Sequence, residues 1–277
     1  MLLITGGYHD PNIACIVSTA SRLGVKFQVA YAGMCQFDWD MENELQLNKR
    51  WIYPKSIFQR FNTFGFDINN KKHYQYYHSW YHAFRAYSLA RKLRCFDLGY
   101  GMTAYCKPLE MLTAQKLGLR LPQTLITDHS VIDNCIFKPI MGGEHTVVLE
   151  DKTQFAGGVG FAQQHLKGQE YRVYVVGEKI FAFRMDTQSL DYRIKQDVTC
   201  APIEPSEICK DGVEVCQKIK TLSDEMQLNY SASDLKMDEA GNLHFLEINS
   251  APMFSEFDRA TDGKLSETMV NWLTEGL

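Results

Sequence analysis

The chain has 277 residues, of which 45% are apolar and 22% are charged, an ordinary globular composition long enough for two or three lobes. Its formal net charge of −4 is far from the basic character that nucleic-acid binding usually needs, so we expect no nucleic-acid partner. No apolar run approaches the roughly 20 residues that span a bilayer, so we expect no membrane partner either.

Residues 1–33 predict a strand, a helix and a second strand. The apolar start ends at Gly6-Gly7, Asp10 suits a helix N-cap, and Gly24 would end the helix. Residues 27–31 then alternate like a strand, so the segment predicts a small α/β lobe. Because the dinucleotide fingerprint GxGxxG is absent, we interpret the glycine pair as a turn.

Residues 71–93 are typical of a helix rich in tyrosine and histidine. His78 and His82 share one face at a spacing that can bind a metal, but no further ligand set accompanies them, so we interpret this face as aromatic packing. Basic residues interleave with aromatic ones from Lys49 to Arg94, as on an RNA-binding surface. We interpret them instead as a helix whose long basic side chains lie along apolar surface.

From residue 107 onwards the pattern changes to hairpins and helices. We expect strands at 124–127, 136–140 and 146–149, hairpins at 171–176/179–185 and 234–237/244–248, and helices at 107–117, 207–227 and 263–275. In the 207–227 helix, the apolar residues expected on or near one face are Val213, Cys216, Ile219, Leu222 and Met226.

The last hairpin carries the strongest chemical signal. Side chains alternate along a strand, so Glu247 and Asn249 should share a face, and pairing with the preceding strand would bring Asp234 close to them. Two carboxylates and an amide carbonyl form a hard oxygen site suited to Mg²⁺ carrying phosphate. The alternative is an acidic edge on a solvated hairpin, which the apolar flanking residues disfavour.

Two lysines form the second signal. Lys138 lies within an apolar strand just before Gly142-Gly143, where a buried ammonium needs an anion and a glycine-rich turn can approach phosphates. Lys107 opens a helix, where it could face an anion docked at the helix N-terminus. Either lysine alone would more often be a surface residue. A Walker A motif is absent, which excludes a P-loop as the phosphate site.

Arginines form the third signal. A short strand and turn at 163–170 lead into the hairpin that holds Arg172 and Arg184, and Arg193 follows in a loop. Arginines at strand ends near acidic metal ligands suit a phosphate or a substrate carboxylate. Taken singly, each is more typical of a surface ion pair.

The eight cysteines show neither CxxC nor Cys/His zinc spacing and mostly lie in apolar segments. The opening segment is too short, and lacks the basic residues, for a secretory signal. We therefore expect a reduced, cytoplasmic protein.

In this order, the three signals resemble the ATP-grasp superfamily over roughly residues 100–277. The resemblance implies an α/β (α+β lobes) fold, the ATP-grasp fold with a short N-terminal α/β domain. The implied division is 1–98 for the N-terminal pre-ATP-grasp domain, 99–166 for the central subdomain and 167–277 for the C-terminal subdomain.

The same resemblance implies a site that binds ATP with Mg²⁺ or Mn²⁺. Residue by residue, it gives Lys107 and Lys138 as phosphate lysines, Gly142 and Gly143 as the glycine-rich loop, Gln163, Gln164, His165 and Leu166 as the adenine-binding linker, Glu170 as the ribose acid, and Asp234, Glu247 and Asn249 as metal ligands. Gln164 departs from the usual glutamate, although an amide there can still form a hydrogen bond. The glycine-rich loop is short and contains an unusual acid, Glu144.

Within the superfamily, the likeness is greatest to ligases resembling glutathione synthetase and ribosomal-protein glutamate ligase, and to microviridin-type (graspetide) peptide maturases. Residues 171–177 and 186–193 carry this likeness. It implies a carboxylate-amine or carboxylate-hydroxyl ligase that acts through an acyl-phosphate and releases ADP and phosphate. Lys138, Arg172 and Arg193 would be the catalytic residues.

A peptide substrate is our first expectation, ahead of an amino-acid or dipeptide substrate, and a homodimer is left open. A non-catalytic ATP-binding protein is a further alternative. The set of two acids and an asparagine argues against it, because simple nucleotide binding does not require all three. A protein that binds no nucleotide comes last, because it leaves Lys138 and the hairpin acids unexplained.

Overall fold

The computed structural model describes residues 1–42, 44–61, 70–98, 106–129, 135–140, 147–149, 158–186 and 199–276. Contacts divide the chain into two compact units, one formed by residues 1–98 with 253–277 and the other by residues 99–252. The sequence-based division placed 253–277 with the residues just before them, whereas the contacts group this segment with the N-terminal residues.

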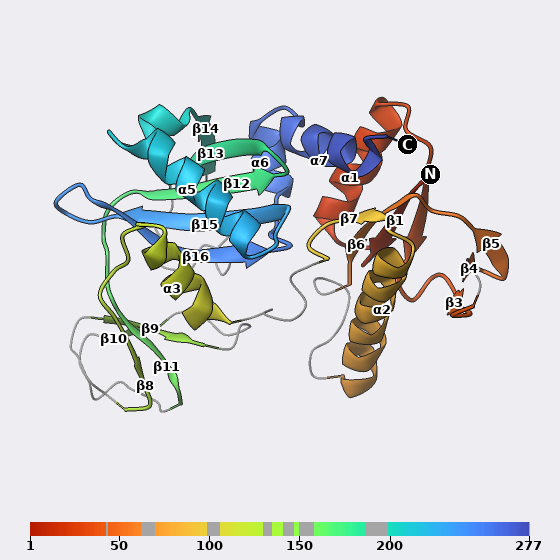
Figure 1. The fold of residues 1–277 in the computed structure, drawn as a ribbon, viewed down its shortest axis with the longest axis horizontal. Coiled ribbons are helices and arrows are strands. Elements are labelled where there is room, and N and C mark those ends of the chain that lie inside the picture. Colours follow the sequence, from red (N-terminus) through yellow and green to blue (C-terminus); the bar gives the residue numbers. More distant parts are fainter. Residues whose placement is uncertain are drawn as a thin grey trace. The chain divides into compact units, whose positions relative to one another are not determined.

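The first unit contains a parallel sheet with strand order β2-β1-β6-β7. Figure 1 labels β1, β6 and β7 of this sheet. Its strands are β1 (Leu2–Gly6), β2 (Phe27–Tyr31), β6 (Ser56–Arg60) and β7 (Arg94–Cys95), and its helices are α1 (Pro11–Arg22), α2 (Lys71–Ala90), α6 (Ser255–Ala260) and α7 (Lys264–Thr274). The predicted strand, helix and strand at the N-terminus are confirmed. Asp10 caps α1 by accepting from Asn12 N at 2.9 Å.

A second sheet of the first unit, β3-β4-β5, was not predicted. Its strands are three residues each: β3 (Phe37–Trp39), β4 (Leu45–Leu47) and β5 (Arg50–Ile52). The expectation that the basic stretch from Lys49 is helical was therefore wrong before Lys71, since β5 and β6 lie in that stretch. Strands this short carry too few alternating positions for sequence periodicity to reveal them.

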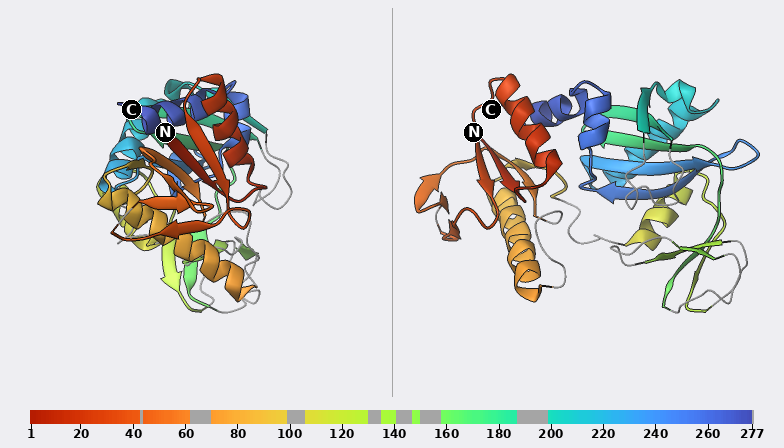
Figure 2. Two further views of the ribbon diagram at one scale, coloured as in Figure 1. Left: turned by 90° about the vertical axis from the view of Figure 1, so that its right-hand side faces the viewer. Right: turned by 180° about the vertical axis from the view of Figure 1, so that it is seen from behind.

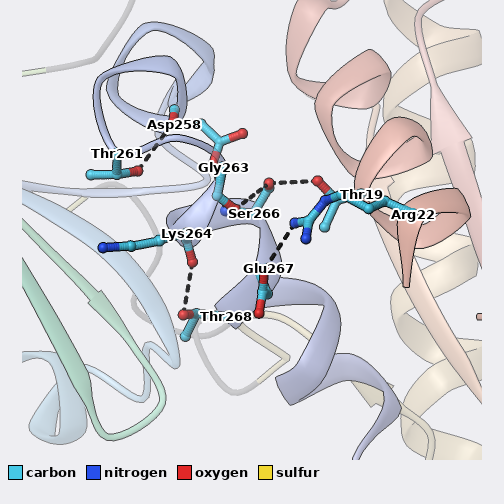
Figure 3. A network of polar contacts seen from close by, with 9 residues as sticks. All are labelled: Thr19, Arg22, Asp258, Thr261, Gly263, Lys264, Ser266, Glu267 and Thr268. Atoms are coloured by element: carbon cyan, nitrogen blue, oxygen red, sulfur yellow. Dashed lines mark hydrogen bonds and ion pairs between the residues drawn. The ribbon is translucent and has the colours of Figure 1, made fainter. Parts of the chain in front are cut away.

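The segment 253–277 is joined to α1 by buried polar contacts. Asn12 Oδ1 accepts from Phe254 N at 2.7 Å and from Ser255 N at 2.9 Å. Figure 3 shows the hydroxyls of Thr19 and Ser266 in contact, at 2.7 Å. These bonds satisfy buried donors that would otherwise destabilise the packed segment.

The second unit contains two sheets in its described residues, of strand order β14-β13-β12-β15-β16 and β10-β9-β11-β8, seen in Figures 1 and 2. The strands of the first are β12 (Glu170–Val176), β13 (Lys179–Asp186), β14 (Thr199–Ile203), β15 (Tyr230–Met237) and β16 (Leu243–Ser250). The strands of the second are β8 (Thr124–Thr127), β9 (Cys135–Pro139), β10 (Val147–Leu149) and β11 (Gly160–Gln164). Both predicted hairpins are confirmed.

The described residues of this unit also form helices α3 (Lys107–Lys116) and α5 (Gly212–Glu225) and the 3₁₀ turn η3 (Pro205–Glu207). The predicted 207–227 helix therefore begins later than expected. Cys216, Ile219, Leu222 and Met226 are buried, as predicted. Val213 is 61% exposed, so placing it on the apolar face was wrong. It lies in the first turn of α5, rotated away from the residues that pack on the sheet.

Candidate active site

The site lies on the sheet face opposite α5. Val173, Val175 and Leu235 belong to the core cluster that also contains the buried residues of α5. Because side chains alternate along a strand, Arg172, next to Val173 on β12, and Asp234, next to Leu235 on β15, face the other side. These two residues are direct neighbours in the antiparallel register. Alternation therefore separates an apolar face from a charged face on the same two strands.

A β-bulge brings Glu247 to the charged face. Asp234 is opposite Glu247, but Leu235 is opposite Phe245, so Leu246 is the extra residue. Strict alternation would put Glu247 on the same face as Phe245, which is buried in the core. The bulge lets Phe245 point into the core and Glu247 point to the charged face. It thereby places the carboxylates of Asp234 and Glu247 opposite each other.

Asn249 lies between the two predicted acidic ligands. Its Nδ2 is 3.4 Å from Asp234 Oδ2 and 3.3 Å from Glu247 Oε1. The orientation of an amide is assigned from its hydrogen bonds, and the opposite orientation would present an oxygen to a cation bound by both acids. Two carboxylates and one amide are oxygen donors that Mg²⁺ accepts, so the residues fit this metal. Among the described residues, no group of three or more His, Cys, Asp or Glu side chains could hold a metal ion by itself, so the candidate set depends on the amide.

Positive side chains balance both acids. Arg172 binds Asp234 in a bidentate manner, with Nε–Oδ1 at 2.6 Å and Nη2–Oδ2 at 2.8 Å. Lys107 Nζ is 3.2 Å from Glu247 Oε2. Burial acts to raise the pKa of Glu247, but the charges of Lys107 and Lys138 outweigh it and lower this pKa to about 2. Glu247 is therefore ionised at neutral pH and ready to bind a cation.

Lys138 belongs to the same charged cluster. It lies on β9 opposite Phe161 of β11. Burial lowers the pKa of its ammonium, while the nearby charge of Glu247 acts in the opposite direction. The structure thus gathers Lys107, Lys138 and the hairpin acids, which are far apart in the sequence.

A pocket of about 550 Å³ adjoins the predicted adenine-binding linker. It is lined by Val148, Gln164, His165, Leu166, Lys167, Asp238, Glu239 and Ala240. Gln163 is not among these residues: its buried side chain donates to Thr124 Oγ1 at 2.9 Å. Burial and the charge of Lys236 lower the pKa of His165, which favours the neutral ring. A concave pocket with a few polar groups suits a small organic ligand.

Glu170 forms an ion pair that was not predicted from the sequence. Lys236 Nζ lies 2.5 Å from Glu170 Oε1, and the two residues are opposite each other on β15 and β12. The available signal was the two-residue spacing between Lys236 and Asp234, which favours one face of the same strand. Gly142, Gly143 and Arg193, also predicted for the site, lie outside the described residues.

No protein-family model matches the chain, and no curated protein does either. Comparison with solved structures, however, shows that the chain has the ATP-grasp fold, which confirms the expected fold class.

One similar structure is the ATP-grasp ligase PsnB complexed with a phosphomimetic variant of its minimal precursor, Mg and ADP. The TM-score is 0.78 at 19% identity, covering 99% of this chain and 98% of the other. Another is a Chryseobacterium gregarium RiPP-associated ATP-grasp ligase in complex with ADP and a leader and core peptide, with a TM-score of 0.75, 18% identity and coverage of 100% and 97%. The macrocyclase MdnC from Microcystis aeruginosa MRC, bound with precursor peptide MdnA, gives a TM-score of 0.73 at 17% identity with 100% of both chains covered.

Proposed function

We propose that this protein is an ATP-dependent, ADP-forming ligase that joins a carboxylate to an amine or hydroxyl, with a peptide as its substrate. The observation that carries the proposal is the cluster of Lys107, Lys138, Asp234, Glu247 and Asn249 in the unit that also contains the linker-lined pocket. Solved neighbours of this fold hold ADP, Mg and precursor peptides, which supports both the nucleotide and the peptide.

The charged face suits transfer of a phosphoryl group from ATP to a carboxylate. ATP's γ-phosphate would pass to the carboxylate, ADP would leave, and the amine or hydroxyl would attack the acyl carbon and expel phosphate. Such transfer needs positioning and neutralised charge more than covalent help from the protein. Lys107 and Lys138 would neutralise phosphate oxygens, joined by Arg193 in our proposal. Mg²⁺ or Mn²⁺ on Asp234, Glu247 and Asn249 would supply charge neutralisation at the phosphates.

Arg172 makes a well-defined contact with one of the predicted metal ligands. Its bidentate contact with Asp234 holds one predicted metal ligand in place. We retain Arg172 as a proposed catalytic residue, together with Lys138 and Arg193. The glycines 142 and 143 remain proposed phosphate contacts, and Gln163, Gln164, His165, Leu166 and Glu170 remain proposed nucleotide contacts.

The expected subdomains, 99–166 and 167–277, remain our proposal for the parts that enclose the nucleotide, with residues 1–98 as the pre-ATP-grasp part. Contacts group residues 253–277 with residues 1–98. All eight cysteines lie in described residues and none forms a disulfide, as the proposed cytoplasmic location requires. Among the described residues, no helix is both long and apolar enough to cross a membrane.

Whether the protein forms a homodimer is open to a direct test. Light scattering of the purified protein would measure its mass in solution.

The class of substrate can be identified by measuring which compounds make the enzyme release ADP. A maturase would require a precursor peptide, including its leader, whereas an amino-acid ligase would turn over with free amino acids. An ATP-binding protein without ligase activity would release no phosphate with any carboxylate and amine. The intact acid-acid-asparagine set favours the ligases over this last alternative.

Nucleotide binding is the first experiment. Calorimetric titration with Mg²⁺ and a non-hydrolysable ATP analogue should give micromolar affinity, about −8 kcal/mol. Lys138→Ala should bind the analogue at least about tenfold more weakly, because one phosphate would lose its positively charged partner. Lys218→Ala is the matched control, since Lys218 pairs with Glu214 on the surface of α5. A folded wild-type protein that binds no nucleotide, with or without a precursor peptide, would overturn the proposal.

A further inference from the structure

Lys236 and Glu170 form a well-defined ion pair beside the proposed nucleotide site. They are opposite each other on β15 and β12, with Nζ–Oε1 at 2.5 Å, and their side chains are only 16% and 20% exposed. The neighbouring Gln169 holds this stretch of backbone, because its Nε2 donates to the carbonyls of Glu170 at 3.1 Å and Met185 at 2.5 Å. The Glu170 carboxylate therefore has restricted freedom.

The pair lies between two parts of the proposed site. The charge of Lys236 acts on His165, which lines the pocket. The charge of Glu170 acts on Lys138, the proposed phosphate lysine. In a nucleotide, the ribose lies between the base and the phosphates. Lys167 and Asp238, which line the pocket, precede Glu170 by three residues and follow Lys236 by two. On the other side of the pair, Arg172 and Asp234 are the next residues of β12 and β15 on the same face. The pair therefore lies between the pocket and the proposed metal ligands, where the sugar of a nucleotide would lie.

An unpaired carboxylate at this position would carry a cost. A nucleotide brings several negative charges, and a second anion within a few ångströms of its phosphates would repel them. Lys236 makes the pair neutral and also holds Oε1. The second carboxylate oxygen can then accept a hydrogen bond from a sugar hydroxyl without net repulsion of the phosphates.

We propose that Lys236 is the positioning residue for sugar recognition: its ammonium fixes Glu170 so that the carboxylate selects a ribose bearing its 2′- and 3′-hydroxyls. This inference rests on the proposed function and adds a residue and a selectivity to it. The competing explanation is structural, in that the pair merely joins β12 to β15. The two explanations differ in one measurable quantity, the preference for ribose over dideoxyribose.

The experiment measures dissociation constants of ADP and 2′,3′-dideoxy-ADP by calorimetry, with Mg²⁺ and the full chain. Their ratio should be at least about tenfold in wild type, the size expected for a hydrogen bond to a charged group. In Lys236→Met the ratio should fall to about twofold, while Lys236→Arg should keep most of it. Lys236→Gln serves as a second uncharged variant, and circular dichroism verifies folding of each protein.

A double-mutant cycle separates positioning from a direct role. If Lys236 acts through Glu170, then Glu170→Gln alone should lower the ratio to about twofold, and adding Lys236→Met should lower it little further. Lys218→Met on α5, on the opposite sheet face, is the control and should keep the wild-type ratio. A purely structural ion pair would weaken both nucleotides equally and leave the ratio unchanged.

Three outcomes would overturn the inference. They are a wild-type ratio near one with ADP still bound, an unchanged ratio in folded Lys236→Met and Lys236→Gln, and full additivity in the cycle. The first of these leaves nucleotide binding, and hence the proposed function, intact. Failure of wild type to bind either nucleotide would instead overturn the proposed function itself.

Discussion

Glu247 is the residue on which the proposed chemistry depends most. It is partly buried, ionised, contacted by Lys107 and close to Asn249. Glu247→Gln keeps the shape but removes the charge that would hold Mg²⁺. We expect turnover to fall by two or more orders of magnitude, on the scale of removing one electrostatic stabiliser, while the fold persists. Phosphate release measured over a Mg²⁺ series checks this, and excess metal should restore little activity.

Glu225→Gln is the matched control for this change. Glu225 is exposed at the end of α5, so its substitution should alter neither turnover nor metal dependence. Wild-type turnover in Glu247→Gln would remove Glu247 from the proposed metal site.

At the scale of single residues, the sequence indicated which side chains belong to the candidate site, but it did not indicate which side chains pair with them. Alternation along the last hairpin was enough to propose Asp234, Glu247 and Asn249 as one group, and the structure brings them together. Spacing could place Lys236 on the same face as Asp234, but the partners in the ion pairs Arg172–Asp234 and Glu170–Lys236 depend on the register between β12 and β15. These strands are separated by β13, β14 and α5 in the sequence, and local periodicity carries no information on their pairing.

Elements with strong periodicity or clear end signals were predicted well, and short or irregular ones were not. Strand β8 and the first helix have the expected positions, whereas β3, β4 and β5 were missed. The bulge at Leu246 was also missed, although two consecutive apolar residues, Phe245 and Leu246, interrupt the alternation. Such an interruption is a sequence signal for a bulge, but a core strand with both faces covered gives the same pattern.

The linker between β11 and β12 offers a test at the scale of an element. A Cβ on Gly168 would lie 2.5 Å from the carbonyl oxygen of Met237, to which Gly168 N donates at 3.1 Å. Gly168→Ala must therefore push the linker away from β15. We expect a loss of about 1–3 kcal/mol in the free energy of unfolding and weaker nucleotide binding. Urea unfolding followed by circular dichroism, and calorimetry with ADP and Mg²⁺, measure the two effects.

Gly24→Ala is the control, because it should also destabilise the protein, but Gly24 belongs to the first unit and not to the linker. Gly24 has φ +66° and nothing within 4 Å of an added Cβ, so alanine should cost only about 1 kcal/mol of backbone strain there. Nucleotide affinity should be unchanged in Gly24→Ala. Equal loss of affinity in both variants would argue that Gly168 has no special role in the linker.

At the scale of the whole molecule, the sequence could not show that the chain returns to its first unit. A helix was expected at 263–275, where α7 lies, yet the buried residues Phe254, Leu265, Met269 and Val270 of this segment belong to a unit that begins at Met1. Tertiary contacts such as Asn12–Phe254 and Thr19–Ser266 reveal this, and both of these join residues more than 200 positions apart. An apolar helix face shows that a partner exists without showing which partner it is.

Asn12→Ala tests this closure of the first unit. The fully buried Asn12 accepts from the backbone N–H groups of Phe254 and Ser255, and alanine would leave both donors unsatisfied. We expect the free energy of unfolding of this unit to fall by roughly 2–4 kcal/mol. All four tryptophans, Trp39, Trp51, Trp80 and Trp272, belong to this unit, so their fluorescence during urea unfolding reports on it alone.

The control Asn271→Ala, at an exposed position on α7, should change the free energy of unfolding by less than about 0.5 kcal/mol. Binding of ADP with Mg²⁺ should survive Asn12→Ala, because the proposed nucleotide contacts all lie within residues 99–252. A loss no larger than that of the control would mean that these bonds do not hold the C-terminal segment.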